Sequence, residues 1–429
     1  MQRSAARRVR RRHALPTGVL LVSALLGCAG YATIPLWRVP VEVRAPDDDV
    51  AAALGDSYGG PTHGFDPAAI PEPPEPTNLR LCCVFGGDFK IVYGVVPIPG
   101  YVLHNMRGPE EIGPHKYNVG LLESVSSEEP GGLERENNGL VYTCRSGFID
   151  LAHLRDYADI TVYLAAKIAR WMDTGGVIEL ADQGGKRRIL LQPIDAERIA
   201  DVGRHPLAVA LAQWLAFQMS TWHELASWYG YAPVPYWPEK MSAFSPEDLY
   251  SSLLGIKLAG GIILFHDTSD DVEYEGAMNA WIKTAMKRMQ TTTKESATAA
   301  IYAVDGRWWD SNKRLPDWQV LLRRNFDAGP SLEPWLVSMA FSPEPGPSIG
   351  CDNAGPPLRL RSPSSFEGVR FEHDATLEID VEDRVAANGF PFPRRRTRRI
   401  TQADLPSLVE QTRREAVAAF GRGYDQPSQ

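Results

Sequence analysis

Apolar residues recur every three or four positions over several long stretches of the chain, the spacing of helices with a buried face. The stretches with this pattern are 148–172, 206–229, 245–255 and 272–290. Ser245 is the expected N-cap of the third helix, with Pro246 in its first turn. A last helix is expected after Thr401, because Asp404 follows three positions later and completes a capping pair.

Shorter runs rich in β-branched, aromatic and other apolar residues predict strands between and after these helices. They lie at 90–98, 116–124, 139–144, 176–180, 187–193 and 369–383. The fourth and fifth runs are joined by "ADQGGK", which predicts a hairpin. Together the patterns predict an α+β fold with a helical majority, built as one main domain with short strands and hairpins.

Composition divides the chain into four regions. Residues 1–28 combine a basic start with a short apolar run, and 29–78 are rich in proline and acidic residues. The second region is therefore expected to be an extended, poorly ordered tether. The main α+β domain is expected at 79–340, followed at 341–429 by a loop-rich extension with one strand and a terminal helix.

The first region has the features of an export signal. Arginines precede the apolar run "ALPTGVLLVSALLG", which is too short and interrupted for a membrane span. The following "LLGC" resembles the lipobox of bacterial lipoproteins, in which the cysteine, here Cys28, is lipidated and becomes the new N-terminus. Cleavage of a plain signal peptide nearby is the alternative. Because Ala29 comes next, we expect an outer-membrane lipoprotein of the cell envelope that faces the periplasm and is held by lipid.

Composition and charge narrow the range of partners. The chain is 44% hydrophobic and 23% charged, as in soluble globular proteins that bury a sizeable core. Its net charge is −8, and removal of the basic leader makes the remainder more acidic. Binding to nucleic acid needs clustered positive charge, so we do not expect a nucleic-acid partner.

The cysteines that remain after Cys28 predict disulfide bonds. They are Cys82, Cys83, Cys144 and Cys351. In an oxidising envelope one or more disulfides are expected among them. The sequence does not choose among the pairings.

In the first predicted helix, a histidine stands among acidic residues. His153 has Asp150 three positions before it, Asp156 three after it and Tyr157 four after it, all within side-chain reach. This pattern is common on solvated helix faces. Apolar residues on the same side favour a covered helix instead; they are Ile160, Tyr163 and Leu164. Both interpretations stay open.

The second predicted helix, 206–229, contains no lysine or arginine, and Glu224 is its only formal charge. Its polar residues form a narrow stripe: Gln213, Ser220, His223, Glu224 and Ser227. Exposed helix faces typically carry lysine, arginine and glutamate, so this stripe predicts an enclosed helix whose polar groups need partners. A membrane span is disfavoured, because His223 beside Glu224 would be costly in lipid.

The pair His223–Glu224 is similar to the start of the HExxH zinc-protease signature, but Ser227 stands where the second histidine belongs. The mechanism of that class therefore does not carry over. The candidate metal ligands from the two helices are His153, Asp156, His223 and Glu224. Such a set suits zinc or a similar divalent ion with an open position for water. We hypothesise a hydrolytic site of metal ligands or acid–base groups, with a structural hydrogen-bond network as the alternative.

Two other functions compete with a metal-dependent hydrolase. Cys144, expected at the start of the first helix, would have a lowered pKa and act as a nucleophile with His115 as its base. A non-catalytic binding or scaffolding lipoprotein would instead expose an apolar patch. Trp308 and Trp309 are candidates for this patch, although tryptophans in loops more often cap a core. Envelope substrates would be peptidoglycan, peptides or phosphoesters, and the sequence does not select among them.

Several separate motifs resemble one family. They are "CCVFGGDF", "VPIPGY", "GPHKYNVG", "VYTCRSGFIDLAHLRDYADIT", "STWHELASWYG" and "FSPEDLYSSLLG". They are similar to a bacterial lipoprotein family known as domain of unknown function 4056, over roughly residues 78–340. The resemblance implies an export signal, and it brings no activity, cofactor or catalytic residue with it.

Overall fold

The computed structural model describes most of the chain. The described residues are 45–55, 73–80, 83–93, 96–119, 136–232, 239–265, 274–342, 344–347, 349–366, 368–393 and 397–428. The predicted signal peptide with Cys28, most of the predicted tether, and Cys82 lie outside the described residues.

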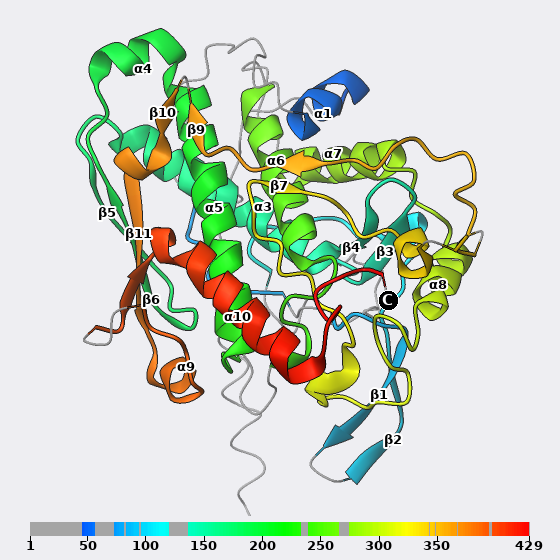
Figure 1. Cartoon of the computed structure of the whole chain (residues 1–429). Helices are drawn as coiled ribbons and strands as arrows, with labels where there is room; N and C mark the ends of the chain where they lie inside the picture. The colour runs from blue at the N-terminus through cyan, green and yellow to red at the C-terminus, as the bar shows by residue number, and fades with distance from the viewer. Residues whose placement is uncertain are drawn as a thin grey trace, which may run out of the picture. The chain divides into compact units, whose positions relative to one another are not determined.

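Helices and short antiparallel strand pairs follow one another along the described residues, and helices predominate (Figure 1). The helices are α1 (Asp47–Leu54), α3 (Leu151–Trp171), α4 (Ala196–Val202), α5 (Arg204–Trp228), α6 (Asp248–Leu264), α7 (Tyr274–Arg288), α8 (Lys294–Ala303), α9 (Asp383–Ala387) and α10 (Leu405–Phe420). The strands are β1 (Asp88–Tyr93), β2 (Val96–His104), β3 (Leu140–Thr143), β4 (Gly147–Asp150), β5 (Gly176–Leu180), β6 (Gly185–Leu191), β7 (Ser331–Leu332), β8 (Leu360–Arg361), β9 (Ser365–Phe366), β10 (Val369–Arg370), β11 (Ala375–Val381) and β12 (Arg399–Thr401). This arrangement confirms the predicted α+β fold with a helical majority.

Three helices, α3, α5 and α6, pack against one another and form the centre of the larger hydrophobic core (Figure 1). Small residues allow their close approach. A Cβ atom on Gly255 would lie 1.8 Å from the backbone oxygen of Leu154, and one on Gly260 would lie 2.0 Å from Gln213 Nε2. Within the described part of the chain, no helix is long and apolar enough to cross a membrane.

The polar side chains of α3 and α5 face this core rather than solvent. Residues from both stripes are at most 4% exposed: His153, Tyr157, Gln213, Ser220 and His223. The buried polar stripe predicted for 206–229 is therefore confirmed. For residues 148–172, the prediction of a covered helix is confirmed, and the alternative of a solvated helix face is wrong.

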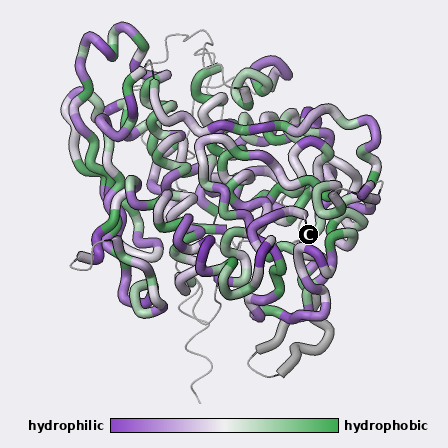
Figure 2. The backbone as a smooth tube through the Cα atoms, viewed as in Figure 1, coloured by the Kyte–Doolittle hydropathy of each residue, from purple (hydrophilic) through white to green (hydrophobic). Residues whose placement is uncertain are grey.

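A four-stranded antiparallel sheet in the order β12-β11-β6-β5 contributes to the same core. Inward and outward residues alternate along β6 and β11, and the two strands pair in full register from Ala375 opposite Leu191 to Val381 opposite Gly185. Hydrophobic and hydrophilic positions are accordingly interspersed along these strands in Figure 2. Since β11 lies between β12 and β6, the C-terminal segment completes the sheet, and α10 contacts α5.

A second, smaller core cluster lies around the β3–β4 hairpin, α8 and the loop that follows α8. Trp308 and Trp309 are fully buried in it. Their indole nitrogens donate to the backbone oxygens of Pro427 and Ile301, respectively. They are core residues and do not form an exposed patch.

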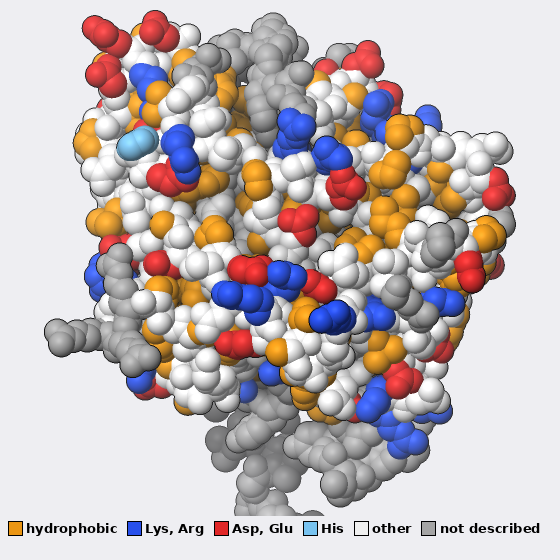
Figure 3. Space-filling model, in the orientation of Figure 1, with side chains coloured by type: hydrophobic (Ala, Val, Ile, Leu, Met, Phe, Trp, Pro, Cys, Tyr) orange, Lys and Arg blue, Asp and Glu red, His pale blue; other side chains and the backbone are white. Residues whose placement is uncertain are grey.

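Charged side chains of both signs are interspersed on the face drawn in Figure 3. In the basic run near residue 397, Arg398 pairs with Asp383 and Arg399 with Asp380. These pairs neutralise part of the positive charge of this run. We still predict, without a test, that nucleic acid is not a partner.

Two local predictions differ from the structure at helix starts. Residues 47–54, inside the predicted tether, form α1, because three aspartates suit the positive end of a helix and Val50 and Leu54 pack into the core. Ser245 is not an N-cap, since its hydroxyl donates to the backbone oxygen of Ser242 and α6 begins at Asp248.

Two further predictions differ in the segments before α3. Lys116 to Val119 are not a strand, and Tyr117 and Asn118 among them form a turn. Cys144 lies in the tight turn of the β3–β4 hairpin and not at a helix N-terminus. Gly147 adopts a φ of 65° there, which favours glycine and lets the chain reverse into β4 before α3 starts.

Candidate metal centre

The N-terminus of α3 fixes the first histidine of the site. Asp150 is the N-cap, and its Oδ1 accepts a hydrogen bond of 2.7 Å from the backbone N–H of Ala152. Its Oδ2 lies 3.1 Å from His153 Nδ1 and also accepts from the backbone N–H of Cys83. A carboxylate that holds Nδ1 in this way leaves Nε2 of the ring to face another group.

The second helix supplies the groups that face His153. Its Nε2 lies 3.4 Å from Glu224 Oε1 on α5, and the rings of His153 and His223 have centroids 5.7 Å apart. The predicted meeting of the two polar stripes is therefore what the structure shows. Glu224 Oε2 accepts a hydrogen bond from the backbone N–H of Phe244, which ties the carboxylate to the segment before α6.

The segment from Glu239 to Asp248 brings further carboxylates close to the two histidines. Glu239 Oε2 lies 3.8 Å from His223 Nε2, and Asp248 Oδ1 lies 3.8 Å from His153 Nδ1. Glu247 precedes Asp248 at the N-terminus of α6. Sequence reasoning missed these three as site residues. A signal was present, because the helix that follows them has a single charged residue after Asp248, namely Lys257, and is otherwise mostly apolar or small.

We call this set the histidine–carboxylate cluster. Its members are Asp150, His153, His223, Glu224, Glu239, Glu247 and Asp248, and each is at most 4% exposed. Several carboxylate oxygens in it have no hydrogen-bond donor: Glu239 Oε1, both oxygens of Glu247, and Asp248 Oδ1. A buried carboxylate without a donor is costly unless it gains a proton or a cation.

Burial also shifts the pKa values of several groups in the cluster toward their neutral forms. Burial raises the pKa of Glu239 to about 8 and raises the pKa values of Glu247 and Asp248 well above their usual range. Burial also lowers the pKa of His223 to about 4. For Glu224, burial opposes ionisation, but His153 and His223 lower the pKa of the carboxyl. The cluster therefore favours neutral groups unless a cation compensates the carboxylates.

The ligand atoms are close enough for a metal ion. Atoms of His153, His223 and Glu224 all lie within 4.8 Å of one another, and so do atoms of Asp150, His153 and Asp248. Two ligands on opposite sides of one ion are separated by about 4 to 5 Å, since metal–ligand distances are about 2.0 to 2.5 Å. Imidazole nitrogens and carboxylate oxygens suit zinc, manganese and related divalent ions.

Asp156, predicted as a fourth ligand, lies in a different network. Its Oδ1 accepts a 2.7 Å hydrogen bond from Arg80 Nη1, and Arg80 also pairs with Glu136 at 2.6 Å and Asp159 at 3.1 Å. Burial raises the pKa of Asp156 to about 7, although Arg80 acts in the opposite direction. Asp156 is thus engaged by a guanidinium, and we do not include it among the ligands.

Cys144, the candidate nucleophile of the alternative hypothesis, is bonded to another residue. Cys144 forms a disulfide with Cys351, one of the pairings that the sequence left open. A disulfide sulfur is not a thiolate and cannot attack a substrate. His115, its predicted base, is fully buried in the Arg80 network, with Nε2 at 2.9 Å from Asp159 Oδ1. The structure therefore gives no support to a Cys144–His115 pair.

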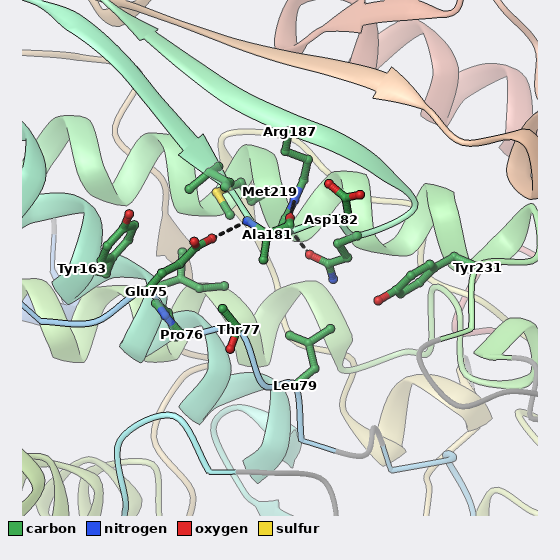
Figure 4. Close-up of a pocket in the computed structure, with 13 residues that line it drawn as sticks. Glu75, Pro76, Thr77, Leu79, Tyr163, Ala181, Asp182, Arg187, Met219 and Tyr231 are labelled. Atoms are coloured by element: carbon green, nitrogen blue, oxygen red, sulfur yellow. Dashed lines mark hydrogen bonds between the residues drawn. The ribbon is translucent and has the colours of Figure 1, made fainter. Parts of the chain in front are cut away.

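A small pocket of about 40 Å³ is drawn in Figure 4, and two of its lining residues, Gln183 and Tyr231, contact His223. Tyr163 from α3, Arg187 from β6 and Met219 from α5 surround it, and the hydroxyl of Tyr231 points into it. The side-chain amide of Gln183, another lining residue, is 2.5 Å from His223 Nδ1. Since one water needs about 10 to 15 Å³, the pocket can hold ordered water next to the cluster.

Fold and site together define an α+β protein with a buried histidine–carboxylate centre between helices. A family model described as "Protein of unknown function (DUF4056)" matches residues 70–338, and the chain belongs to this family. The matched residues include the whole histidine–carboxylate cluster, whereas β11, β12 and α10 come after them. No curated protein matches the chain, and no solved structure matches it.

Proposed function

We propose that the chain is a lipid-anchored protein of the bacterial cell envelope that binds a divalent cation and uses it to hydrolyse its substrate. The observation that carries this proposal is the convergence of His153, His223 and Glu224 within 4.8 Å, beside buried carboxylate oxygens that lack donors. A cation at this point would bind three side chains and compensate the buried negative charge.

The neighbouring residues fit the needs of such a reaction. A bound divalent ion lowers the pKa of its water and so supplies a nucleophile near neutral pH. Asp150 orients His153 through Nδ1. Glu239, with its pKa raised to about 8, keeps its proton at neutral pH and is a candidate acid for the leaving group. The pocket beside Gln183 offers a reservoir of water on the His223 side.

The metal content of the purified full-length chain tests the proposal. We expect a divalent metal in elemental analysis and a rise in the melting temperature when zinc or manganese is added to the metal-free protein. His153→Ala should lose both effects. His373→Ala, a change of an exposed histidine, is the matched control and should keep them. Absence of bound metal and of any metal effect on stability would contradict the proposal.

A structural cation is the second candidate function, and the burial of the cluster favours it. None of its residues is more than 4% exposed, as expected for an ion that only holds helices together. Assays of the metal-loaded protein on phosphoesters, peptides and peptidoglycan fragments separate the two. Stabilisation by metal with no turnover of these substrates supports the structural role.

The anchor has its own test. Cys28→Ala should move the protein from the membrane fraction to the soluble periplasmic fraction and should abolish incorporation of labelled fatty acid. Ser57→Ala is the control, because it changes a residue outside the lipobox-like sequence and leaves the Cys144–Cys351 disulfide intact. Unchanged membrane attachment of Cys28→Ala would contradict lipid anchoring at this residue.

A further inference from the structure

We propose that the histidine–carboxylate cluster holds two divalent cations, with the second bound by the carboxylates of Asp150, Glu247 and Asp248. This inference rests on the proposed function, because it assigns a second ion to the same centre. The first ion lies on the Nε2 side of His153, and the second lies on the opposite side of that ring.

The first argument is the set of oxygens that one ion leaves unsatisfied. An ion bound by His153, His223 and Glu224 does not involve Glu247 or Asp248. Both oxygens of Glu247 and one oxygen of Asp248 lack donors, and the two residues are 2% and 1% exposed. Asp248 nevertheless forms a compact group with His153 and Asp150, with ligand atoms within 4.8 Å of one another.

Charge supplies the second argument. The cluster contains five carboxyl groups and two imidazoles. Among the residues that the structure describes, no lysine or arginine forms an ion pair with any of these carboxyl groups. The proposed function assigns a proton to Glu239, so it is left out of the count. If the other four carboxyl groups are ionised, one divalent cation leaves a net charge of about −2 and two leave about zero. Two cations therefore remove most of the cost of burying this charge.

The geometry of His153 separates the two positions. Nε2 faces Glu224, whereas Nδ1 faces Asp150 at 3.1 Å and Asp248 at 3.8 Å. Because Asp150 Oδ2 accepts the Nδ1 proton, the ring need not bind both ions. Asp150 Oδ1 accepts one hydrogen bond, from Ala152, and retains a lone pair for a cation.

The two positions differ in ligand chemistry. The first has two imidazoles and one carboxylate, a set that suits zinc or manganese. The second has carboxylate oxygens alone, which suit manganese or magnesium. Pairs of ions about 3.5 to 4 Å apart hold both the attacking and the leaving oxygen in hydrolysis of phosphoesters and peptides. A phosphoester or peptide is accordingly the substrate class that this centre favours.

Titration of the metal-free, full-length protein with manganese chloride tests the inference. We expect two equivalents of bound manganese per chain by calorimetry and by elemental analysis after desalting. Electron paramagnetic resonance of the loaded protein should show a spin-coupled pair rather than the six-line signal of an isolated ion. The double variant Glu247→Gln/Asp248→Asn should bind one equivalent, with the six-line signal and a Kd within tenfold of the tighter wild-type site.

Glu197→Gln/Asp201→Asn on α4 is the matched control, because it removes two exposed acidic groups, and it should keep two equivalents. One equivalent in the wild type, lost in His153→Ala, would overturn the second ion and leave the proposed function standing. No binding at all would overturn both. Two equivalents in the Glu247→Gln/Asp248→Asn variant would overturn the ligand assignment. If that variant fails to fold, wild-type stoichiometry and spin coupling decide the question.

Discussion

At the scale of single residues, Gln183 controls which nitrogen of His223 carries the proton. Arg187 donates to Gln183 Oε1, so the amide N–H group is the end that faces His223 Nδ1. The metal-free ring then has its proton on Nε2, the nitrogen that faces the cluster. A cation at Nε2 has to displace this proton, which weakens binding.

Gln183→Glu should remove that cost, because a carboxylate only accepts and moves the proton to Nδ1. We expect manganese to bind about tenfold more tightly to this variant at pH 7, an effect typical of a carboxylate behind a metal-bound histidine. Calorimetric titration measures it, with the exposed Gln192→Glu as control. Equal or weaker binding by Gln183→Glu would show that His223 Nε2 is not a ligand.

The buried carboxyl group of Glu136 should make the stability of the fold depend on pH. Burial alone would raise its pKa, but Arg80 and Arg155 overcome this effect and hold the pKa far below its ordinary value of 4.5. The ionised carboxylate thus stabilises the fold above pH 4.5, and this contribution is lost as the pH falls further.

Glu136→Gln should lower the free energy of unfolding by about 3 kcal/mol at pH 7, because Arg80 stays buried with one partner fewer. Urea unfolding at pH 7, 5 and 3.5 measures the difference between variant and wild type. We expect the difference to shrink at pH 3.5. The exposed Glu179→Gln should change stability little at any of these values. A difference that is independent of pH would contradict the argument.

At the scale of elements, the contact between α3 and α6 sets the position of the cluster. Gly255→Ala should cost about 2 to 3 kcal/mol, because its Cβ would lie 1.8 Å from Leu154 O and force the helices apart. We also expect weaker cation binding, since α3 carries His153 and α6 begins at Asp248. Thermal unfolding and metal titration test both effects. Gly355→Ala, whose nearest neighbour is the flexible Arg145 side chain at 3.2 Å, should be tolerated.

The periodic elements of the site were predictable from sequence, and its irregular parts were not. His153, His223 and Glu224 lie on long helices, where a spacing of three or four residues determines the face. Glu239 reaches the cluster from a 3-10 turn, whose path depends on tertiary contacts. The contact of Asp156 with Arg80 was not predictable, because Arg80 comes from a non-helical segment remote in sequence. No local pattern indicates such a pairing.

At the scale of the whole molecule, the sheet depends on residues beyond the family match. β11 pairs along the full length of β6, so its removal would leave β6 as an open edge. A chain that ends at residue 340 should accumulate mainly in the insoluble fraction, unlike the full-length chain expressed in parallel. Ile379→Ala, at a fully buried position of β11, should cost about 2 to 4 kcal/mol in urea unfolding. A soluble, cooperatively unfolding truncated protein would contradict this dependence.

The bond between Cys144 and Cys351 links residues 207 positions apart. The earlier cysteine therefore has to wait until most of the polypeptide has been made before its partner exists. If the chain is exported unfolded, oxidation cannot close this covalent ring until Cys351 has also crossed the membrane. An oxidant that acted sooner would join Cys144 to another sulfur, so correct maturation depends on late oxidation or on an isomerase that repairs early errors.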